Sequence, residues 1–329
     1  MKVLKSGVPI LVILVTLAFG TLPAAAQQSM VDLGTLGGSW SEANGINDGG
    51  QVVGASLTVL GEIHAFLFQH GTLTDLGALG GNESYAYAIN NLGQIVGKSS
   101  TPDGSVHAVL WERGVPIDLG TLGGGWSEAY GINDIGQVVG ASLTVLGEIH
   151  AFLFQHGTLT DLETLGGGWS QAYRINSRGQ IVGASATALG ELHAFLWENG
   201  KMVDLGTLGG KESYALGSND LGQVVGASEA GPSNKVHAFL WEAGTMTDLG
   251  TLGRGSSYAW AINNRGQIVG YSDTTRGETH AFLWEAGTMT DLGTLGWKSS
   301  FAYAINNRGQ IAGASYIGPV VEHACLWSR

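Results

Sequence analysis

Serine, histidine and aspartate recur together along this chain, and these three residue types can form a hydrolytic triad. The sets in the first and sixth repeats are Ser56, His64 and Asp75, and Ser272, His280 and Asp291. A triad needs an exposed serine, an oxyanion hole and one privileged site, whereas here the set returns along the whole chain. We therefore expect a buried structural network, in which each histidine donates a hydrogen bond to aspartate and accepts one from serine. No catalytic residue is assigned.

The repeat that carries these residues is about 43 residues long. In each of seven repeats an asparagine opens an N-x-x-G-Q-[IV]-[VA]-G stretch, at Asn47, Asn90, Asn133, Asn176, Asn219, Asn263 and Asn306. A histidine follows each asparagine, but an aspartate in a D-L-[GE] motif follows only six of the seven histidines. The missing segment, 30–34, lies ahead of the first repeat. This offset predicts a ring that closes by pairing its two ends, with Ser315 and His323 completing their set through Asp32.

Within the repeat the pattern predicts four short strands and no helix. In the sixth repeat they cover 257–263, 267–272, 280–284 and 289–292, which we call strands a, b, c and d. Glycine-containing turns separate a from b and c from d. Four strands in about 43 residues are typical of a propeller blade. An open β-solenoid is the alternative, but it needs polar capping repeats, and neither end of the chain diverges in that way.

We therefore predict an all-β fold, a seven-bladed β-propeller of four-stranded blades. Residues 27–329 form this single domain, and 30–34 complete the blade of 299–329. Residues 1–26 read as a secretory signal peptide, because a basic start and an apolar run precede three alanines. A membrane anchor is the alternative for this segment, although the apolar run is short for a span. We expect a secreted or periplasmic monomer with no membrane span after the signal is removed.

The net charge of −12 argues against nucleic acid as a partner, because such binding needs a basic surface. Cys325 is the only cysteine, so no internal disulfide can form. No metal site or cofactor is expected. Asp48, Asp134 and Asp220 follow the repeat asparagine and loosely resemble calcium loops, but their spacing lacks the alternating oxygen ligands and the closing glutamate of such loops. A role in the turn is favoured over Ca²⁺ binding.

The motifs His-Ala-Phe-Leu-Trp, Ala-Ile-Asn-Asn-x-Gly-Gln-Ile-Val-Gly and Asp-Leu-Gly-Thr-Leu-Gly-Gly recur over 30–329. In these motifs the chain resembles the HAF-repeat family of bacterial extracellular proteins, and its blade pattern is similar to that of Kelch and WD-type β-propellers. Departures include Phe68 and Phe154 in place of tryptophan and Ser218 in place of isoleucine. The resemblance implies an extracellular location and no particular activity.

The loops between b and c and between d and a emerge on one face of a propeller, and the b–c loops vary most. We assign the candidate ligand-binding residues to the d–a loops of this face: Trp40, Trp126, Trp169 and Trp297, with Glu42 and Glu128 nearby. Tryptophan beside carboxylates can stack a sugar ring or grip a peptide. The alternative is that each tryptophan only covers the apolar top of its blade.

The leading hypothesis is an exported, non-catalytic propeller that binds a glycan or a protein through this loop face. Its basis is that every polar residue with chemical potential is repeated, while variation is confined to one face. One alternative is an extracytoplasmic enzyme that acts on a polysaccharide or a lactone through a metal-assisted site at the central channel. Another is a structural protein of envelope assembly that binds no small ligand.

Overall fold

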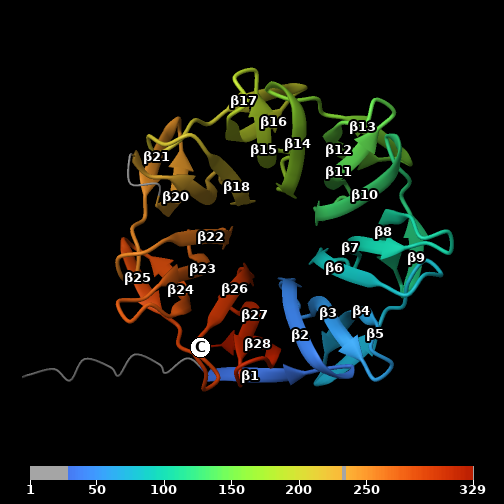
Figure 1. The fold of residues 1–329 in the computed structure, drawn as a ribbon, viewed down its shortest axis with the longest axis horizontal. Coiled ribbons are helices and arrows are strands. Elements are labelled where there is room, and N and C mark those ends of the chain that lie inside the picture. Colours follow the sequence, from blue (N-terminus) through green and yellow to red (C-terminus); the bar gives the residue numbers. More distant parts are fainter. Residues whose placement is uncertain (1–28, 232–234, 329) are drawn as a thin grey trace, which may run out of the picture.

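A computed structural model describes residues 29–231 and 235–328. The predicted signal segment 1–26 lies outside these residues. The described residues form strands arranged as a ring of seven blades around a central channel (Figure 1). None of their elements is a helix long and apolar enough to cross a membrane. The chain is therefore an all-β, seven-bladed propeller, as the repeat predicts.

Each blade is an antiparallel meander of four strands that runs from the channel outward. The innermost strands (a) are β2 (Gly37–Ile46), β6 (Ser84–Ile89), β10 (Gly123–Ile132), β14 (Gly166–Ile175), β18 (Ser213–Ser218), β22 (Ser257–Ile262) and β26 (Ser300–Ile305). The second strands (b) are β3 (Val52–Thr58), β7 (Ile95–Ser100), β11 (Val138–Thr144), β15 (Ile181–Thr187), β19 (Val224–Glu229), β23 (Ile268–Asp273) and β27 (Ile311–Tyr316).

The third strands (c) are β4 (Ile63–Gln69), β8 (Val106–Glu112), β12 (Ile149–Gln155), β16 (Leu192–Glu198), β20 (Val236–Glu242), β24 (Thr279–Glu285) and β28 (Glu322–Ser328). The outer strands (d) are β5 (Thr72–Asp75), β9 (Val115–Asp118), β13 (Thr158–Asp161), β17 (Lys201–Asp204), β21 (Thr245–Asp248), β25 (Thr288–Asp291) and β1 (Ser29–Gly34). In the sixth blade, β22 to β25 begin and end within one residue of the predicted strands.

The ring closes through its first strand. β1 pairs antiparallel with β28, with Met30 opposite Trp327 and Asp32 opposite Cys325. In Figure 1 the blue β1 lies along the red last blade, at the outer edge that the other blades fill with their own fourth strand. The predicted closure is confirmed.

A close approach between strands a and b explains the glycine that ends each N-x-x-G-Q-[IV]-[VA]-G motif. A Cβ atom on Gly226 would overlap the backbone carbonyl oxygen of Tyr214 on the neighbouring strand. The corresponding glycines of the other six blades meet the same obstacle: Gly54, Gly97, Gly140, Gly183, Gly270 and Gly313. The turn glycine has a different cause, because Gly266 has a φ of 75°, a conformation that L side chains rarely adopt.

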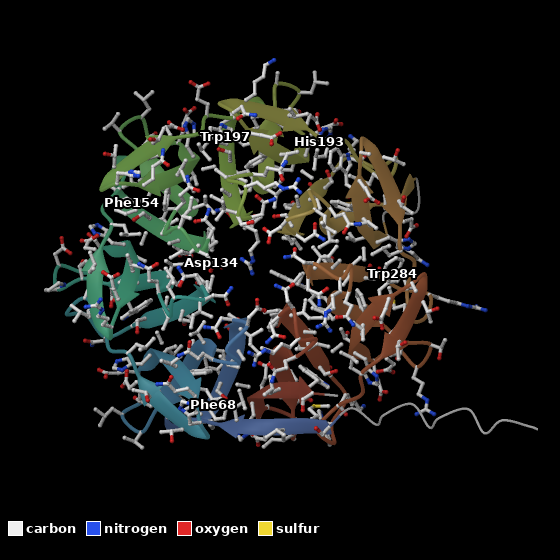
Figure 2. The ribbon with its side chains drawn as sticks, turned by 180° about the vertical axis from the view of Figure 1, so that it is seen from behind. Phe68, Asp134, Phe154, His193, Trp197 and Trp284 are labelled. Carbon is white, nitrogen blue, oxygen red and sulfur yellow. The ribbon has the colours of Figure 1, made fainter. Side chains whose placement is uncertain are left out.

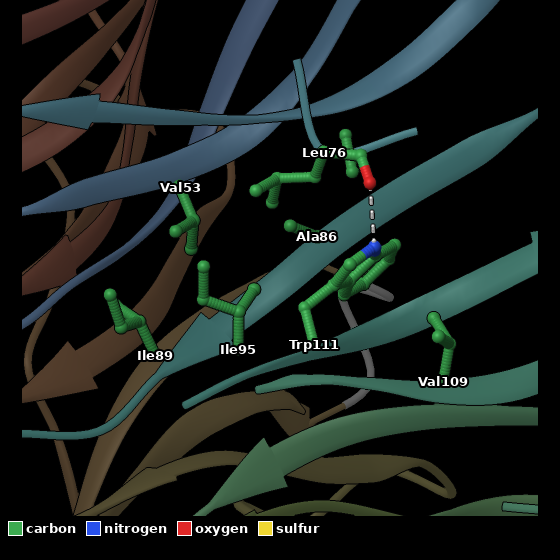
Figure 3. Close-up of a cluster of buried hydrophobic side chains, with 8 residues drawn as sticks. Val53, Leu76, Ala86, Ile89, Ile95, Val109 and Trp111 are labelled. Carbon is green, nitrogen blue, oxygen red and sulfur yellow. Dashed lines mark hydrogen bonds between the residues drawn. The ribbon is translucent and has the colours of Figure 1, made fainter. Parts of the chain in front are cut away.

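The hydrophobic core consists of clusters between neighbouring blades. One such cluster joins Val53 and Leu76 of the first blade to Ile95 and Trp111 of the second. Figure 3 shows the indole of Trp111 donating a hydrogen bond of 3.1 Å to the carbonyl oxygen of Leu76. Each blade is therefore packed against its neighbours around the ring.

Candidate functional site

The repeated histidine and aspartate meet in every blade. His64 Nδ1 lies 2.8 Å from Asp75 Oδ2, and in the last blade His323 Nδ1 lies 2.8 Å from Asp32 Oδ2 across the closure. His280 and Asp291 form the same contact in the sixth blade. Each aspartate also fixes the d–a turn, since Asp75 Oδ1 accepts the backbone N–H of Gly77 at 2.8 Å. This half of the expected network is a repeated structural contact.

The serine does not join this network, contrary to our expectation. Ser56 lies opposite His64 in the strand register, but its Oγ accepts the N–H of Leu36 at 2.8 Å and donates to the carbonyl of Trp40 at 3.1 Å. Ser272 and Ser315 bind the equivalent segments of their own blades. The backbone N–H of Leu36 needs an acceptor, and the fully buried hydroxyl of Ser56 supplies it. Such a serine is no nucleophile.

A second repeated serine, on strand a, links neighbouring blades and was missed from the sequence. Ser84 Oγ donates to the carbonyl of Gly77 at 2.7 Å and accepts the N–H of Ala65 at 2.9 Å. Its equivalents make the same contacts: Ser41, Ser127, Ser170, Ser213, Ser257 and Ser300. Its constant place in the repeat, six residues before the asparagine, was the available signal.

The seven repeat asparagines form a closed ring at the channel mouth on the a–b turn side. The side-chain amide of each donates to the backbone carbonyl of the next, and Asn306 donates to Asn47 at 3.0 Å. This mouth encloses about 190 Å³. Asp134, near the channel in Figure 2, accepts the N–H of Asn91 at 2.8 Å and its side-chain amide at 2.9 Å.

The other two turn aspartates accept hydrogen bonds in the same way. Asp48 accepts the N–H and the side-chain amide of Asn307, and Asp220 accepts the N–H of Ser177 and the amide of Asn264. These bonds hold the pKa of Asp220 below its usual value, although burial opposes them. Within 29–231 and 235–328, no three or more His, Cys, Asp or Glu side chains are grouped so that they could hold a metal ion.

Three of the candidate tryptophans lie in strands, so their placement in loops is wrong. Trp40, Trp126 and Trp169 belong to β2, β10 and β14. Each pairs with the preceding blade, as Trp40 does with Glu322. Before Trp40 the chain crosses strand b so closely that a Cβ atom on Gly38 would overlap Leu57. Trp297 does lie in a loop and is 42% exposed. Among the described residues that line the cavity below, none of these four appears.

The structure instead shows a cavity of about 470 Å³ in the channel, which we call the mouth cavity. Its wall consists of side chains from the innermost strands, with Tyr271 added from strand b of the sixth blade. Three residues before the repeat asparagine the blades carry Asn44, Tyr87, Tyr130, Tyr173, Leu216, Trp260 and Tyr303, and all seven line it. Since strand a begins at the b–c and d–a face and ends at the a–b turn, this cavity lies toward the loop face.

The aromatic rings of the mouth cavity contact one another along its wall. The ring centroids of Tyr87 and Tyr130 are 5.4 Å apart, and those of Tyr130 and Tyr173 are 5.8 Å apart. On the other side Trp260 meets Tyr303 edge-on at 5.5 Å. These distances are typical of favourable aromatic pairs. The rings therefore form a preorganised surface.

Two of the predicted site residues, Glu42 and Glu128, do line the mouth cavity. Glu128 accepts a hydrogen bond from Tyr130 at 2.9 Å and forms an ion pair with Lys98 at 3.0 Å. Glu42 has no such cation: desolvation raises its pKa, the amide of Asn44 opposes that shift, and the nearby charge of Glu322 adds to it. The two carboxylates therefore occupy different electrostatic environments.

Sequence reasoning missed the residues that break the repeat inside the channel. Lys98 and Tyr271 stand on strand b where the other five blades carry alanine. Arg174 stands on strand a where the other blades carry glycine or alanine. Arg174 and Tyr271 line the mouth cavity, and Lys98 reaches it through Glu128. A comparison of the seven repeats position by position was the signal that could have found them.

Comparison with solved structures supports the fold. The chain is similar to the WD40 β-propeller domain of Doa1 (TM-score 0.52, 16% identity, 92% of this chain and 97% of that chain covered). It is also similar to the β-propeller domain of the Trilobed protease from Pyrococcus furiosus (0.54, 10%, 75% and 82%). A third match is a puromycin-hydrolyzing peptidase from Mycobacterium tuberculosis (0.56, 12%), where the alignment covers 90% of this chain and half of that one.

At these identities the likeness shows a β-propeller and nothing about activity. The matched chains include a WD40 domain as well as a protease and a peptidase. No protein-family model and no curated protein matches the chain. The resemblance to HAF repeats therefore stays a prediction.

Proposed function

We propose that this protein is a non-catalytic binding propeller that holds a saccharide in its mouth cavity. The proposal rests on one observation, which is that the residues that differ between repeats gather in one cavity. The structural contacts recur around the whole ring, whereas the wall of the mouth cavity differs from blade to blade. Scaffold residues are constrained alike in every blade, so unrepeated residues that converge in one cavity indicate a ligand.

The chemistry of the wall favours a sugar. A pyranose presents C–H groups that pack on aromatic faces and hydroxyls that bind carboxylates and amides, and Tyr130, Trp260, Glu42 and Asn44 offer both kinds of partner. A volume of about 470 Å³ falls within the usual range for small-molecule sites. The proposal keeps the predicted loop face but moves the site from the tryptophans at the strand starts into the channel.

The test compares saccharide binding by wild-type protein and by variants that borrow a residue from another blade. Tyr130→Asn copies Asn44, and Trp260→Leu copies Leu216, so each substitution already occurs at that position of the ring. We expect calorimetric titration with a panel of mono- and disaccharides to show about tenfold weaker binding in both variants. Trp297→Ala, at an exposed residue outside the cavity wall, should bind as the wild type does.

Unchanged affinity in both cavity variants would contradict the proposal. If Trp126→Ala combined with Trp169→Ala weakened binding instead, the site would return to the originally predicted tryptophans. Binding of a protein partner that is insensitive to all of these changes would favour the scaffold or envelope-assembly hypotheses.

A second candidate function is glycoside hydrolysis through the two carboxylates of the mouth cavity. The observation that favours it is the contrast between Glu42, whose pKa is raised by burial, and Glu128, which is paired with Lys98. Such a contrast is how a general acid and an ionised carboxylate are distinguished in glycosidases. Hydrolysis that is lost in both Glu42→Gln and Glu128→Gln, with binding retained, would establish this function. Binding without turnover in the wild type would eliminate it.

The proposed setting of this activity is outside the cytoplasm, in the periplasm or secreted. It rests on the signal-like sequence of 1–26. Intact mass measurement of protein recovered from periplasm and medium should show loss of this segment. A cytoplasmic protein with its full mass would contradict export.

A further inference from the structure

Below the mouth cavity the channel narrows, and isoleucines from six blades line this part. This narrow part encloses about 170 Å³. One residue before the repeat asparagine, six blades place an isoleucine there: Ile46, Ile89, Ile132, Ile175, Ile262 and Ile305. The fifth blade places Ser218 at this position, and the fourth places Arg174 one residue earlier, where the other blades have glycine or alanine. These two polar departures lie on the neighbouring strands β14 and β18.

The guanidinium of Arg174 is a partly buried cation without a carboxylate partner. Its Nη1 donates to the carbonyl oxygens of Tyr130 and Tyr173 at 2.9 and 2.8 Å, which fixes the side chain against the wall. None of the ion pairs formed by the described residues includes it. Desolvation lowers the pKa of Arg174 to about 10, so the group stays charged at neutral pH. A cation held partly out of water without an anion is unfavourable.

The hydroxyl of Ser218 is also without a partner. Its Oγ is buried and forms no hydrogen bond to any described residue. Buried polar groups are nearly always hydrogen-bonded, and an exception calls for an explanation such as a ligand. Arg174 is the only charged residue that lines both the narrow part and the mouth cavity. A group seated in the mouth cavity can therefore reach the guanidinium.

We infer that Arg174, which lines the mouth cavity, and Ser218, which lines the narrow part below it, form a carboxylate subsite where the two parts of the channel meet. The saccharide bound there would be an acidic sugar of the uronic acid class. This inference rests on the proposed function. The carboxylate would accept hydrogen bonds from the guanidinium and from the hydroxyl, while the pyranose ring packs on the aromatic wall above. Arg174 and Ser218 would then both have partners.

The carboxylates of the mouth cavity are compatible with an acidic ligand. The negative charge of Glu128 is already balanced by its ion pair with Lys98. Glu42 stands on the first blade, across the ring from the fourth, and burial raises its pKa toward the neutral form. Both remain available as acceptors for sugar hydroxyls.

The experiment compares charged and neutral forms of one sugar on matched variants of the full chain. The probes are D-glucuronate, D-galacturonate and D-mannuronate, each against its parent hexose and its uronamide, with sodium acetate as the carboxylate alone. Arg174→Ala copies the residue of three other blades, and Ser218→Ile copies the residue of six. Arg178→Ala removes an exposed arginine of the same blade and is the control.

We expect at least one uronate to bind the wild type about 10- to 100-fold more tightly than its neutral parent, the range for hydrogen bonds to a charged group. Arg174→Ala should abolish this preference, because it lowers the affinity for the uronate far more than the affinity for the neutral sugar. Ser218→Ile should reduce the preference, and Arg178→Ala should keep it. Without ligand, Arg174→Ala should unfold at a temperature equal to or above that of the wild type, since the partly buried, unpaired charge is gone.

Each other outcome contradicts a stated part. Equal affinity for uronates and neutral sugars, or a uronate preference that survives Arg174→Ala, would overturn the subsite while leaving the saccharide site intact. Uronate binding no tighter than acetate binding would overturn the assignment to a sugar. Absence of binding by every sugar would overturn both this inference and the proposed function.

Discussion

The ring of repeat asparagines gives a prediction whose size follows from its contacts. Asn263 is 4% exposed. Its amide nitrogen donates to Gln267 Oε1 at 2.7 Å and to the carbonyl oxygen of Asn306 at 3.0 Å. Its Oδ1 accepts the N–H groups of Arg265 and Gln267, both at 3.0 Å. Asn263→Ala removes all four hydrogen bonds and opens the ring at one link.

A typical hydrogen bond contributes about 1 kcal/mol net, and a buried group left without a partner costs more. We expect the free energy of unfolding to fall by roughly 2 to 4 kcal/mol, the lower figure applying where water from the adjacent cavity replaces a lost partner. For a chain of this size that corresponds to a decrease of roughly 3 to 6 °C in the melting temperature.

The measurement is thermal unfolding followed by circular dichroism, with Asn82→Ala as the matched control. Asn82 is exposed, so the same chemical change should alter stability by less than about 0.5 kcal/mol. Hydrogen exchange should locate the loss at the a–b turns of the sixth and seventh blades. If Asn263→Ala and Asn82→Ala melted within one degree of each other, the ring would not stabilise the propeller.

Three further predictions concern closure, close packing and pH. Deleting 29–34 should lower the melting temperature by more than about 10 °C and expose the amides of β28 to hydrogen exchange, because the closing strand and the buried Leu33 are lost; an unchanged melting curve would refute the closure. Gly226→Ala should destabilise the protein by more than about 4 kcal/mol or prevent folding, since the new Cβ atom would overlap a backbone carbonyl oxygen. Gly125→Ala is the control, because the space around its Cβ atom is open, and it should leave the thermal unfolding curve unchanged. The raised pKa of Glu42 means that the folded state binds its proton more tightly than the unfolded state, so this contribution to stability is greatest below the unfolded value of about 4.5 and is lost as pH rises through the folded value. Glu42→Gln should therefore stabilise the protein more at pH 7 than at pH 4, and equal shifts in melting temperature at the two pH values would contradict the environment assigned to this carboxyl.

Much of the fold could be predicted because the repeat itself reports it. The strands of the sixth blade lie within one residue of their predicted bounds. Only six of the seven histidines are followed by an aspartate, and this missing segment predicted that the strand at the start of the chain completes the last blade. The contact between His64 and Asp75 also followed from the pattern. Local spacing determines these features, and local spacing is what a sequence displays.

The site was less accessible to such reasoning. Ser56 faces His64 in register, yet its hydroxyl binds a backbone amide, a choice that depends on which unpaired groups lie nearby in three dimensions. Trp40 reads as a loop residue because the glycines before it are typical of loops, while here they permit a close crossing. The role of Arg174 appears only when seven innermost strands face one channel, an arrangement that no single repeat contains.

The composite last blade has a consequence for how the chain is ordered. Since the two ends of the described chain are held side by side by β1 and β28, a short linker could join them, and new ends could be opened at another surface turn. Every such circular permutant would keep the same pairings and merely move the two-part blade elsewhere. Which blade is built from both ends of the chain therefore depends on the order of the strands along the chain, and the ring itself would be the same with any other blade in that role.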